Sequence, residues 1–301
     1  MPTLDLKARA EAERIGEAVR RVTRALNLVG VDTPSRDARL LVAEAAGFDS
    51  GRLIAEPDRP TTQVECRRLA EMVKRRCARE PVSRILGRRE FYGRDFSISP
   101  AVLDPRPDSE TLIETALALV DEEGWRARPI RILDVGTGSG CLLVTLLAEL
   151  PAASGVGTDV SADALEVAAQ NAGRHGVASR ARFKIRRSLT GLEEHFDLLV
   201  CNPPYISTHE IALLAPEVRD NDPRAALDGG ADGFSVYREV IPDLGRIMSS
   251  GWGLFEVGAG QAGAVAELLK PVCGLQGSAD VRFASDLGGH GRCVAAKLQL
   301  E

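Results

Sequence analysis

The fold is decided by residues 132–140, which read Ile132-Leu133-Asp134-Val135-Gly136-Thr137-Gly138-Ser139-Gly140. The first four residues are typical of a buried strand, and the alternating glycines predict a tight turn whose backbone can approach a ligand closely. An apolar run at 142–150 then predicts a helix. Ligands of open α/β sheets bind where the strands end, so we expect a binding site at this turn. A tight turn without a ligand is the structural alternative.

Helix and strand patterns alternate around this turn. We expect helices at 109–122 and 142–150 and one ending at Arg174, and strands at 130–135, 155–160, 182–185, 196–201, 253–257, 281–284 and 293–298. Such alternation predicts a parallel sheet with helices on both faces, so the fold class is α/β.

The N-terminal region has a different pattern. Residues 4–79 carry apolar positions at helical spacing and almost no strand signal, which predicts about four short helices. Thr33-Pro34 is typical of a helix start, and Thr62 with Glu65 fits a capping box. The region is expected to be all-helical.

Short aromatic runs broken by glycine and proline follow between Pro81 and Pro107, among them Glu90-Phe91-Tyr92-Gly93. They predict a β-hairpin linker. We therefore divide the chain into a helical domain at 1–80, the linker at 81–108 and an α/β domain at 109–301.

Composition excludes several classes of protein. The 301 residues are 44% hydrophobic and 27% charged, as in an ordinary globular protein. A net charge of -5 disfavours clamping of long duplex DNA, so no direct nucleic-acid contact is expected. The six cysteines and four histidines lack metal-ligand spacing, so we expect no metal. Without a signal core or a membrane-length apolar run, the protein is expected to be cytoplasmic, with no membrane partner.

The glycine spacing separates two cofactors. A dinucleotide fingerprint needs G-x-G-x-x-G, but the spacing here is G-x-G-x-G, with Cys141 where a glycine would be required. The compact loop preceded by Asp134 resembles the first motif of class I methyltransferases, which implies S-adenosylmethionine as the cofactor. The predicted cofactor-binding residues of this loop are Asp134, Gly136, Thr137, Gly138, Ser139 and Gly140.

Asp159 ends the next predicted strand, where a carboxylate can accept hydrogen bonds from both ribose hydroxyls. We predict that it binds the cofactor. The alternative is a structural role beside Ser161, which is placed to cap the following helix.

A second motif, Asn202-Pro203-Pro204-Tyr205, follows the strand predicted at 196–201. It should lie at the same sheet edge as the glycine loop. The two prolines stiffen the turn and leave carbonyls free. The Asn202 oxygen and the Pro203 carbonyl can each accept one N–H of a planar NH2 group, and Tyr205 can form an aromatic wall beside it.

We therefore predict that Asn202, Pro203, Pro204 and Tyr205 are catalytic and bind the substrate, and that Asn202 also contacts the cofactor. The motif alone does not choose between glutamine, adenine and cytosine amines. An ordinary turn after a strand is its structural alternative.

The whole chain resembles the HemK/PrmC family of peptide-chain-release-factor glutamine N5-methyltransferases. Beyond the two motifs, the resemblance rests on Pro81-Val82-x-x-Ile85-Leu86-Gly87, Glu90-Phe91-Tyr92-Gly93, Pro105-Arg106-Pro107-Asp108-Ser109-Glu110 and Asp222-Pro223-Arg224-Ala225-Ala226-Leu227-Asp228-Gly229-Gly230-x-Asp232-Gly233.

The resemblance implies a helical N-terminal domain that helps to bind the release factor. It also implies a Rossmann-like seven-stranded methyltransferase domain whose last strand is antiparallel. The implied reaction is direct methyl transfer to the glutamine of the Gly-Gly-Gln loop of class I release factors, without a metal.

The chain departs from the family pattern in two places. Asp104 stands where an apolar residue is usual. The family commonly has an acidic residue and an aromatic beside the adenine, but this chain has Arg186-Arg187-Ser188-Leu189-Thr190. Ser188 is the nearest polar substitute, and we predict that it binds the cofactor.

Three alternative functions stay open. The related enzymes that methylate a ribosomal protein usually carry Arg-Ser-Pro where this chain has Arg106-Pro107-Asp108, which favours release factors. An adenine-N6 DNA or RNA methyltransferase would flip a base onto the same motif, but it would need a basic target-recognition domain. A cofactor-binding regulator without transferase activity is suggested only by the altered segment at Arg187-Ser188.

Overall fold

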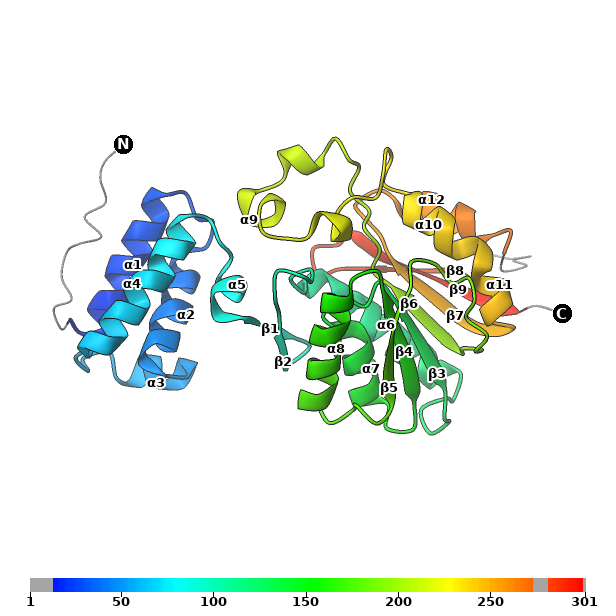
Figure 1. Ribbon diagram of the computed structural model, residues 1–301, viewed down its shortest axis with the longest axis horizontal. Coiled ribbons are helices and arrows are strands. Elements are labelled where there is room, and N and C mark those ends of the chain that lie inside the picture. The colour runs from blue at the N-terminus through cyan, green and yellow to red at the C-terminus, as the bar shows by residue number, and fades with distance from the viewer. Residues whose placement is uncertain (1–12, 273–280, 300–301) are drawn as a thin grey trace. The chain divides into compact units, whose positions relative to one another are not determined.

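The structure, a computed structural model, describes residues 13–272 and 281–299. The chain divides into two compact units, one up to Gly87 and the other from Arg88 (Figure 1).

The first unit is helical over its described residues, as predicted, and the first part of the predicted helical region, residues 4–12, lies outside them. Its helices are α1 (Ile15–Leu28), α2 (Pro34–Ala46), α3 (Ser50–Ala55), α4 (Gln63–Cys77) and α5 (Val82–Leu86). Its apolar core includes Ile15, Val22, Leu26, Leu41, Leu69 and Val73.

Two helix starts in this unit were predicted from the sequence. Helix α4 opens with the expected capping box, in which Glu65 N–H donates to Thr62 Oγ1 at 3.3 Å and Thr62 N–H donates to Glu65 Oε2 at 2.8 Å. Helix α2 begins at Pro34 after Thr33, as expected, but the Thr33 hydroxyl bonds Asp37 at 3.1 Å instead of a backbone N–H.

The second unit opens with an antiparallel hairpin of β1 (Arg88–Phe91) and β2 (Arg94–Ser97). The hairpin is shorter than the segment from Pro81 to Pro107 in which it was predicted. Residues 82–86 instead form helix α5, which ends at Gly87 in the left-handed conformation.

A seven-stranded sheet forms the body of the second unit, in the order β5-β4-β3-β6-β7-β9-β8. The last strand, β9, is antiparallel to both of its neighbours, β7 and β8, whereas the other described strand pairs of this sheet are parallel, which confirms the predicted antiparallel last strand. The strands are β3 (Arg131–Val135), β4 (Ser154–Asp159), β5 (Ala181–Ile185), β6 (Leu198–Cys201), β7 (Ser250–Glu256), β8 (Val281–Ser285) and β9 (Gly291–Gln299).

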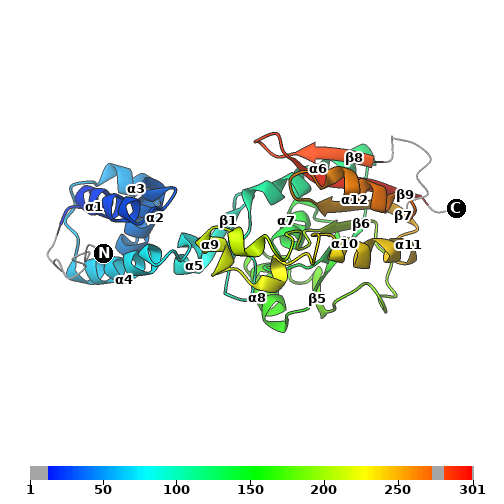
Figure 2. The same cartoon turned by 90° about the horizontal axis from the view of Figure 1, so that it is seen from above.

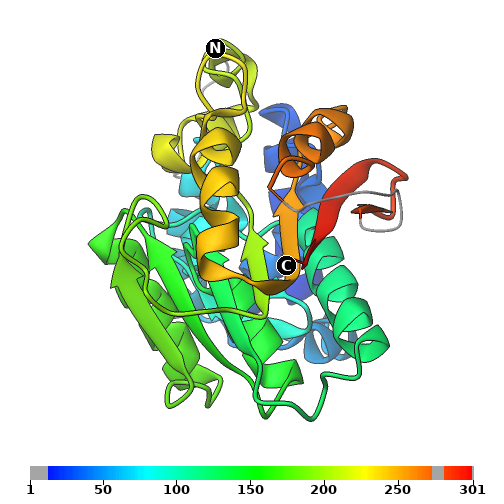
Figure 3. The same cartoon turned by 90° about the vertical axis from the view of Figure 1, so that its right-hand side faces the viewer.

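Helices cover both faces of the sheet, as the alternating pattern predicted (Figures 2 and 3). One face packs against α6 (Glu110–Glu122), α7 (Cys141–Glu149) and α8 (Ala162–Arg174), and the other against α10 (Ser235–Val240), α11 (Leu244–Ile247) and α12 (Ala262–Leu269). Short helical turns complete the unit: η1 (Pro107–Ser109), η2 (Ile211–Leu213), α9 (Pro216–Arg219), η3 (Arg224–Ala226) and η4 (Ile241–Asp243).

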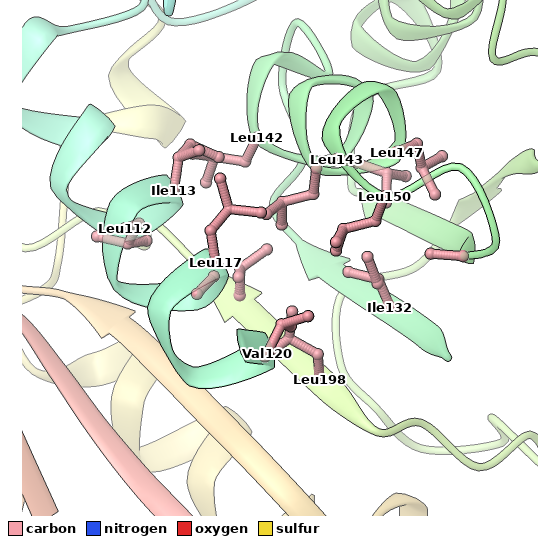
Figure 4. Close-up of a cluster of buried hydrophobic side chains, with 14 of the residues drawn as sticks. Leu112, Ile113, Leu117, Val120, Ile132, Leu142, Leu143, Leu147, Leu150 and Leu198 are labelled. Carbon is pink, nitrogen blue, oxygen red and sulfur yellow. The ribbon is translucent and has the colours of Figure 1, made fainter. Parts of the chain in front are cut away.

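The strand side chains alternate between two apolar cores, one on each face of the sheet. On β6, Leu198 and Val200 belong to one core, and Leu199 and Cys201 belong to the other. Figure 4 shows the first core, in which leucines of α6 and α7 meet Ile132 and Leu198 of the sheet. This packing fixes the strand ends that carry the two motifs.

Candidate active site

The pairing of β3 with β6 brings the two motifs together. The strands are parallel, and Val135 lies opposite Cys201, so the glycine loop and the Asn-Pro-Pro-Tyr turn leave adjacent strand ends. Strand β3 has β4 on its other side, which makes this the point where the chain switches direction across the sheet. Both motifs line one cleft of about 820 Å³.

The glycine loop has a backbone that only glycine adopts easily. Gly136, Gly138 and Gly140 have φ values of +71°, +53° and +79°. A Cβ at Gly136 would meet no atom within 4 Å, whereas one at Gly140 would lie 3.1 Å from Ala168 Cβ. Gly136 and Gly138 line the cleft together with Thr137 and Ser139, and Gly140 packs beneath them.

Asp134 lies under this loop and does not line the cleft. It is completely buried, and the Thr137 hydroxyl donates to its Oδ2 at 2.6 Å. Burial raises the pKa of Asp134 to about 7, although the hydrogen bond from Thr137 opposes the shift. The carboxyl therefore supports the loop from below.

Asp159 lines the cleft at the end of β4. Its Oδ2 accepts the Gly138 N–H at 2.9 Å, and its Oδ1 accepts the Ser161 N–H at 3.0 Å. The Ser161 hydroxyl caps α8 by accepting the Ala164 N–H at 3.2 Å. The carboxylate thus holds the glycine loop, and each oxygen keeps a further lone pair for a ligand.

Asn202 and Pro203 lie at the boundary of two cavities. Both line the large cleft and also a second pocket of about 210 Å³, which Tyr205 lines as well. The Asn202 Nδ2 group donates to Ser109 Oγ at 3.1 Å, and no residue in the described ranges donates to its Oδ1. Pro204 lines the large cleft. One hydrogen-bond acceptor of Asn202 is therefore free at this boundary.

A glycine-rich segment packs against the backbone of the turn. Ile206 N–H donates to the Leu227 carbonyl at 3.1 Å, and Gly229 N–H donates to the Ile206 carbonyl at 2.8 Å. A Cβ at Gly233 would lie only 2.4 Å from the Tyr205 carbonyl oxygen. This close packing explains the glycines of the Asp222–Gly233 motif.

The segment before α6 is tied to the same motif. Asp104, the unusual residue there, is 2% exposed, and its N–H donates to Asp222 Oδ1 at 3.4 Å. Arg106 donates to the other oxygen of Asp222 at 2.5 Å. These bonds join two segments that line the cleft and lie more than 100 residues apart in sequence.

Ser188 was predicted to bind the cofactor from a position outside both motifs. It does not line the cleft, and its hydroxyl accepts the Thr190 N–H at 3.4 Å. Arg186 and Arg187 line the cleft instead. The sequence assignment missed Val160, an apolar residue that also lines the cleft and is 54% exposed. Its position directly after Asp159 is the signal that would have found it.

The cleft fits S-adenosylmethionine. Its volume is within the range typical of small-molecule sites. The bare glycine backbone leaves room at Gly136, the Asp159 carboxylate suits ribose hydroxyls, and Val160 offers an apolar surface for an adenine ring.

No cluster of metal-ligating side chains occurs in the described part of the chain, and none of its helices is long and apolar enough to span a membrane.

The sheet order and the cleft at the switch point define a class I methyltransferase fold. Two family models match the chain, the PrmC N-terminal domain at residues 17–87 and the methyltransferase small domain at residues 114–219. The chain belongs to the family of release factor glutamine methyltransferases, as the sequence motifs predicted.

Curated relatives support the assignment of the chain to this family. The chain is 48% identical to the release factor glutamine methyltransferase of Agrobacterium fabrum over 74% of this chain and 77% of that protein. It is 43% identical to that of Bradyrhizobium diazoefficiens over 95% of both chains. Among solved structures, the hMettl16 catalytic domain in complex with MAT2A 3'UTR hairpin 6 shares the fold, with a TM-score of 0.53, 17% identity and coverage of 79% of this chain and 84% of that one.

Proposed function

We propose that the protein transfers a methyl group from S-adenosylmethionine to the side-chain amide nitrogen, N5, of the glutamine in the Gly-Gly-Gln loop of class I peptide chain release factors. The observation that carries this proposal is the position of Asn202 and Pro203 between the large cleft and the smaller pocket. The names of the curated relatives support a release factor as the substrate.

The cofactor side of the site is the glycine loop. When bound, S-adenosylmethionine supplies a methyl group on a positively charged sulfur. Gly136 and Gly138 let the backbone come close to it, and Asp159 accepts the ribose hydroxyls while it holds Gly138. Asp134 acts through Thr137, and we assign the adenine contact to Val160 because Ser188 lies outside the cleft lining.

The acceptor side is the Asn-Pro-Pro-Tyr turn. An amide nitrogen is a weak nucleophile because its lone pair is delocalised into the carbonyl. Asn202 Oδ1 and the Pro203 carbonyl each accept one N–H of the glutamine amide, which orients the lone pair toward the methyl carbon. The nitrogen would take the methyl group in one displacement while the methyl–sulfur bond breaks, which would leave S-adenosylhomocysteine as the product. The extra proton on the nitrogen would leave to solvent afterwards.

The helical unit is proposed to help bind the release factor. Its match to the PrmC N-terminal domain supports this role. As predicted from the sequence, we expect the enzyme to work in the cytoplasm.

The experiment that tests the function offers labelled S-adenosylmethionine together with a release factor, with ribosomal proteins, or with DNA and RNA. We expect label in the release factor, and mass spectrometry should place one methyl group on the peptide that contains Gly-Gly-Gln. A release factor whose glutamine is replaced by glutamate is the matched control and should stay unlabelled. Label in nucleic acid alone, or in a ribosomal protein alone, would overturn the proposal.

A further inference from the structure

A buried carboxylate lies beside the Asn-Pro-Pro-Tyr turn. Glu256 is the last residue of β7, whose Phe255 pairs with Cys201, so Glu256 lies next to the start of the turn. It is 1% exposed, on a strand whose neighbouring residues are apolar. A carboxylate is rarely buried so completely unless other groups satisfy it.

Glu256 is connected to both ends of the turn. The Tyr205 hydroxyl donates to its Oε1 at 3.4 Å. The Ser109 hydroxyl lies beside the carboxylate, whose other oxygen, Oε2, is buried and has no hydrogen-bond partner among the described residues. Ser109, itself 2% exposed, receives the Asn202 Nδ2 group at 3.1 Å. The first and last residues of the motif therefore depend on one side chain from another strand.

The hydrogen-bond donors and acceptors that link Glu256, Ser109 and Asn202 fix which end of the Asn202 amide faces Ser109. When Glu256 is ionised, its carboxylate only accepts hydrogen bonds, so the Ser109 proton can turn to the unpaired oxygen of Glu256. The Ser109 oxygen is then left to accept from Asn202, and only the nitrogen end of the amide can donate to it. Asn202 Oδ1 must consequently face away from Ser109, where a substrate N–H needs an acceptor.

We propose that Glu256 is a positioning residue for methyl transfer, which acts through Ser109 and Tyr205 to keep Asn202 Oδ1 turned toward the substrate amide. This inference rests on the proposed function, because it assumes that Asn202 accepts an N–H of the substrate. Without an acceptor at position 256, the Ser109 proton is free to turn toward Asn202, and the amide can reverse.

The surroundings of Glu256 are consistent with this role. Burial raises the pKa of Glu256 to about 7, and the nearby Asp108 adds to the rise. The neighbouring Ser109 hydroxyl, the positive charge of Arg292 and the hydrogen bond from Tyr205 oppose the rise, so Glu256 is ionised for the most part only above about pH 7. Arg292 is bound to Asp286 at 2.8 Å and to Asp108 at 3.0 Å, so its charge is already shared.

The test compares two substitutions of similar size. Glu256→Gln keeps an acceptor oxygen, and Glu256→Leu removes it. With the release factor as substrate, we expect kcat of Glu256→Gln to stay within about fivefold of wild type, and kcat of Glu256→Leu to fall about 100-fold. The calorimetric affinity for S-adenosylmethionine should stay within about threefold in both variants, because Glu256 is not part of the cofactor side.

A second variant tests the link itself. Ser109→Ala leaves Glu256 in place but breaks its connection to Asn202, so it should lose kcat to a similar extent as Glu256→Leu. The double variant should be no worse than either single one, because both break one chain of interactions. Ser109→Ala also keeps the inference testable where Glu256→Leu does not fold.

Three results would overturn the inference: wild-type kcat in a folded Glu256→Leu or in Ser109→Ala, equal losses in Glu256→Gln and Glu256→Leu, or additive losses in the double variant. A failure of the proposed function would look different, because the wild-type protein itself would then leave the release factor unmethylated.

Discussion

The glycine loop and the Asn-Pro-Pro-Tyr turn begin at adjacent strand ends, but the contacts that hold them come from different parts of the chain. The loop is held mainly by near neighbours, since Thr137 bonds Asp134 and the Gly140 N–H donates to the Thr137 carbonyl. Its longer links run from Gly138 to Asp159 at the end of the next strand and from the Ser139 carbonyl to Asn171 of α8, which donates to it at 2.8 Å. The turn is held by Ser109 and by residues beyond 226, including Gln261, whose Nε2 donates to the Tyr205 carbonyl at 3.0 Å.

This difference teaches which part of the site depends on the whole domain. A loop held by contacts within one stretch of the chain offers a binding surface as soon as that stretch, from β3 to α8, has folded. A turn held by distant segments is correct only when those segments are packed, and that suits a group whose orientation decides the rate. We therefore expect substitutions in the loop to change cofactor affinity and those around the turn to change turnover.

Removal of the acceptor itself should have the largest effect. Asn202→Ala deletes the oxygen that holds one N–H of the substrate, so kcat should fall about 100- to 1,000-fold. The measurement is steady-state methylation of a release factor at saturating cofactor. A kcat within tenfold of wild type would remove Asn202 from the proposed mechanism.

A smaller but still large loss should follow when the support of the turn is disturbed. In Gly233→Ala the new Cβ would meet the Tyr205 carbonyl, so the turn must shift, and we expect kcat to fall about 100-fold. Gly289→Ala is the matched control, because its φ of +79° is close to the +81° of Gly233 but no atom lies within 4 Å of its Cβ. Equal kcat in the two variants would show that the contact with the turn is unimportant.

A tenfold effect, this time on affinity, is expected in the glycine loop. Gly136→Ala places a methyl group in the cleft and should weaken S-adenosylmethionine binding about tenfold or more, with little further change in kcat. Gly176→Ala is its control, because Gly176 has the same φ of +71° and open space around its Cβ but does not line the cleft. Both variants carry a similar backbone strain of about 1–2 kcal/mol, so only the affinity should separate them. Equal affinities would place the cofactor elsewhere.

The sequence predicted the loop and the turn but not what holds the turn. Alternating strand and helix patterns are local, and they were enough to predict a parallel sheet with helices on both faces and to place Asn202 at the same sheet edge as the glycines. Ser109, Gly233 and Glu256 reach the turn only through the fold, and no local pattern connects them with it. Ser188 was assigned by analogy to a family position, and the backbone carries it outside the cleft lining. Val160 was missed because an apolar residue at the end of a strand is usually part of the core, whereas Val160 is exposed.

The smallest predicted effect concerns stability and pH. Asp134 has its pKa raised from 3.8 to about 7, so the folded protein holds a proton there that the unfolded chain releases. Stability from this group is therefore complete below about pH 4 and is lost as the pH rises toward 7. In Asp134→Asn, the fall in unfolding free energy between pH 5 and 6 should be less steep by up to about 1.4 kcal/mol per pH unit.

Urea unfolding followed by tryptophan fluorescence measures this slope. Both tryptophans of the chain, Trp125 and Trp252, are buried in the α/β unit, so the signal reports that unit. The same slope in the variant and the wild type would show that Asp134 is ionised in the folded protein throughout this range.

The division of labour between the two motifs is tested most directly by the affinity of Asn202→Ala for S-adenosylmethionine, measured by calorimetry. If the loop binds the cofactor and the turn orients the acceptor, the dissociation constant should stay within about threefold of wild type while kcat falls by orders of magnitude. A loss of affinity as large as the loss of kcat would contradict this division.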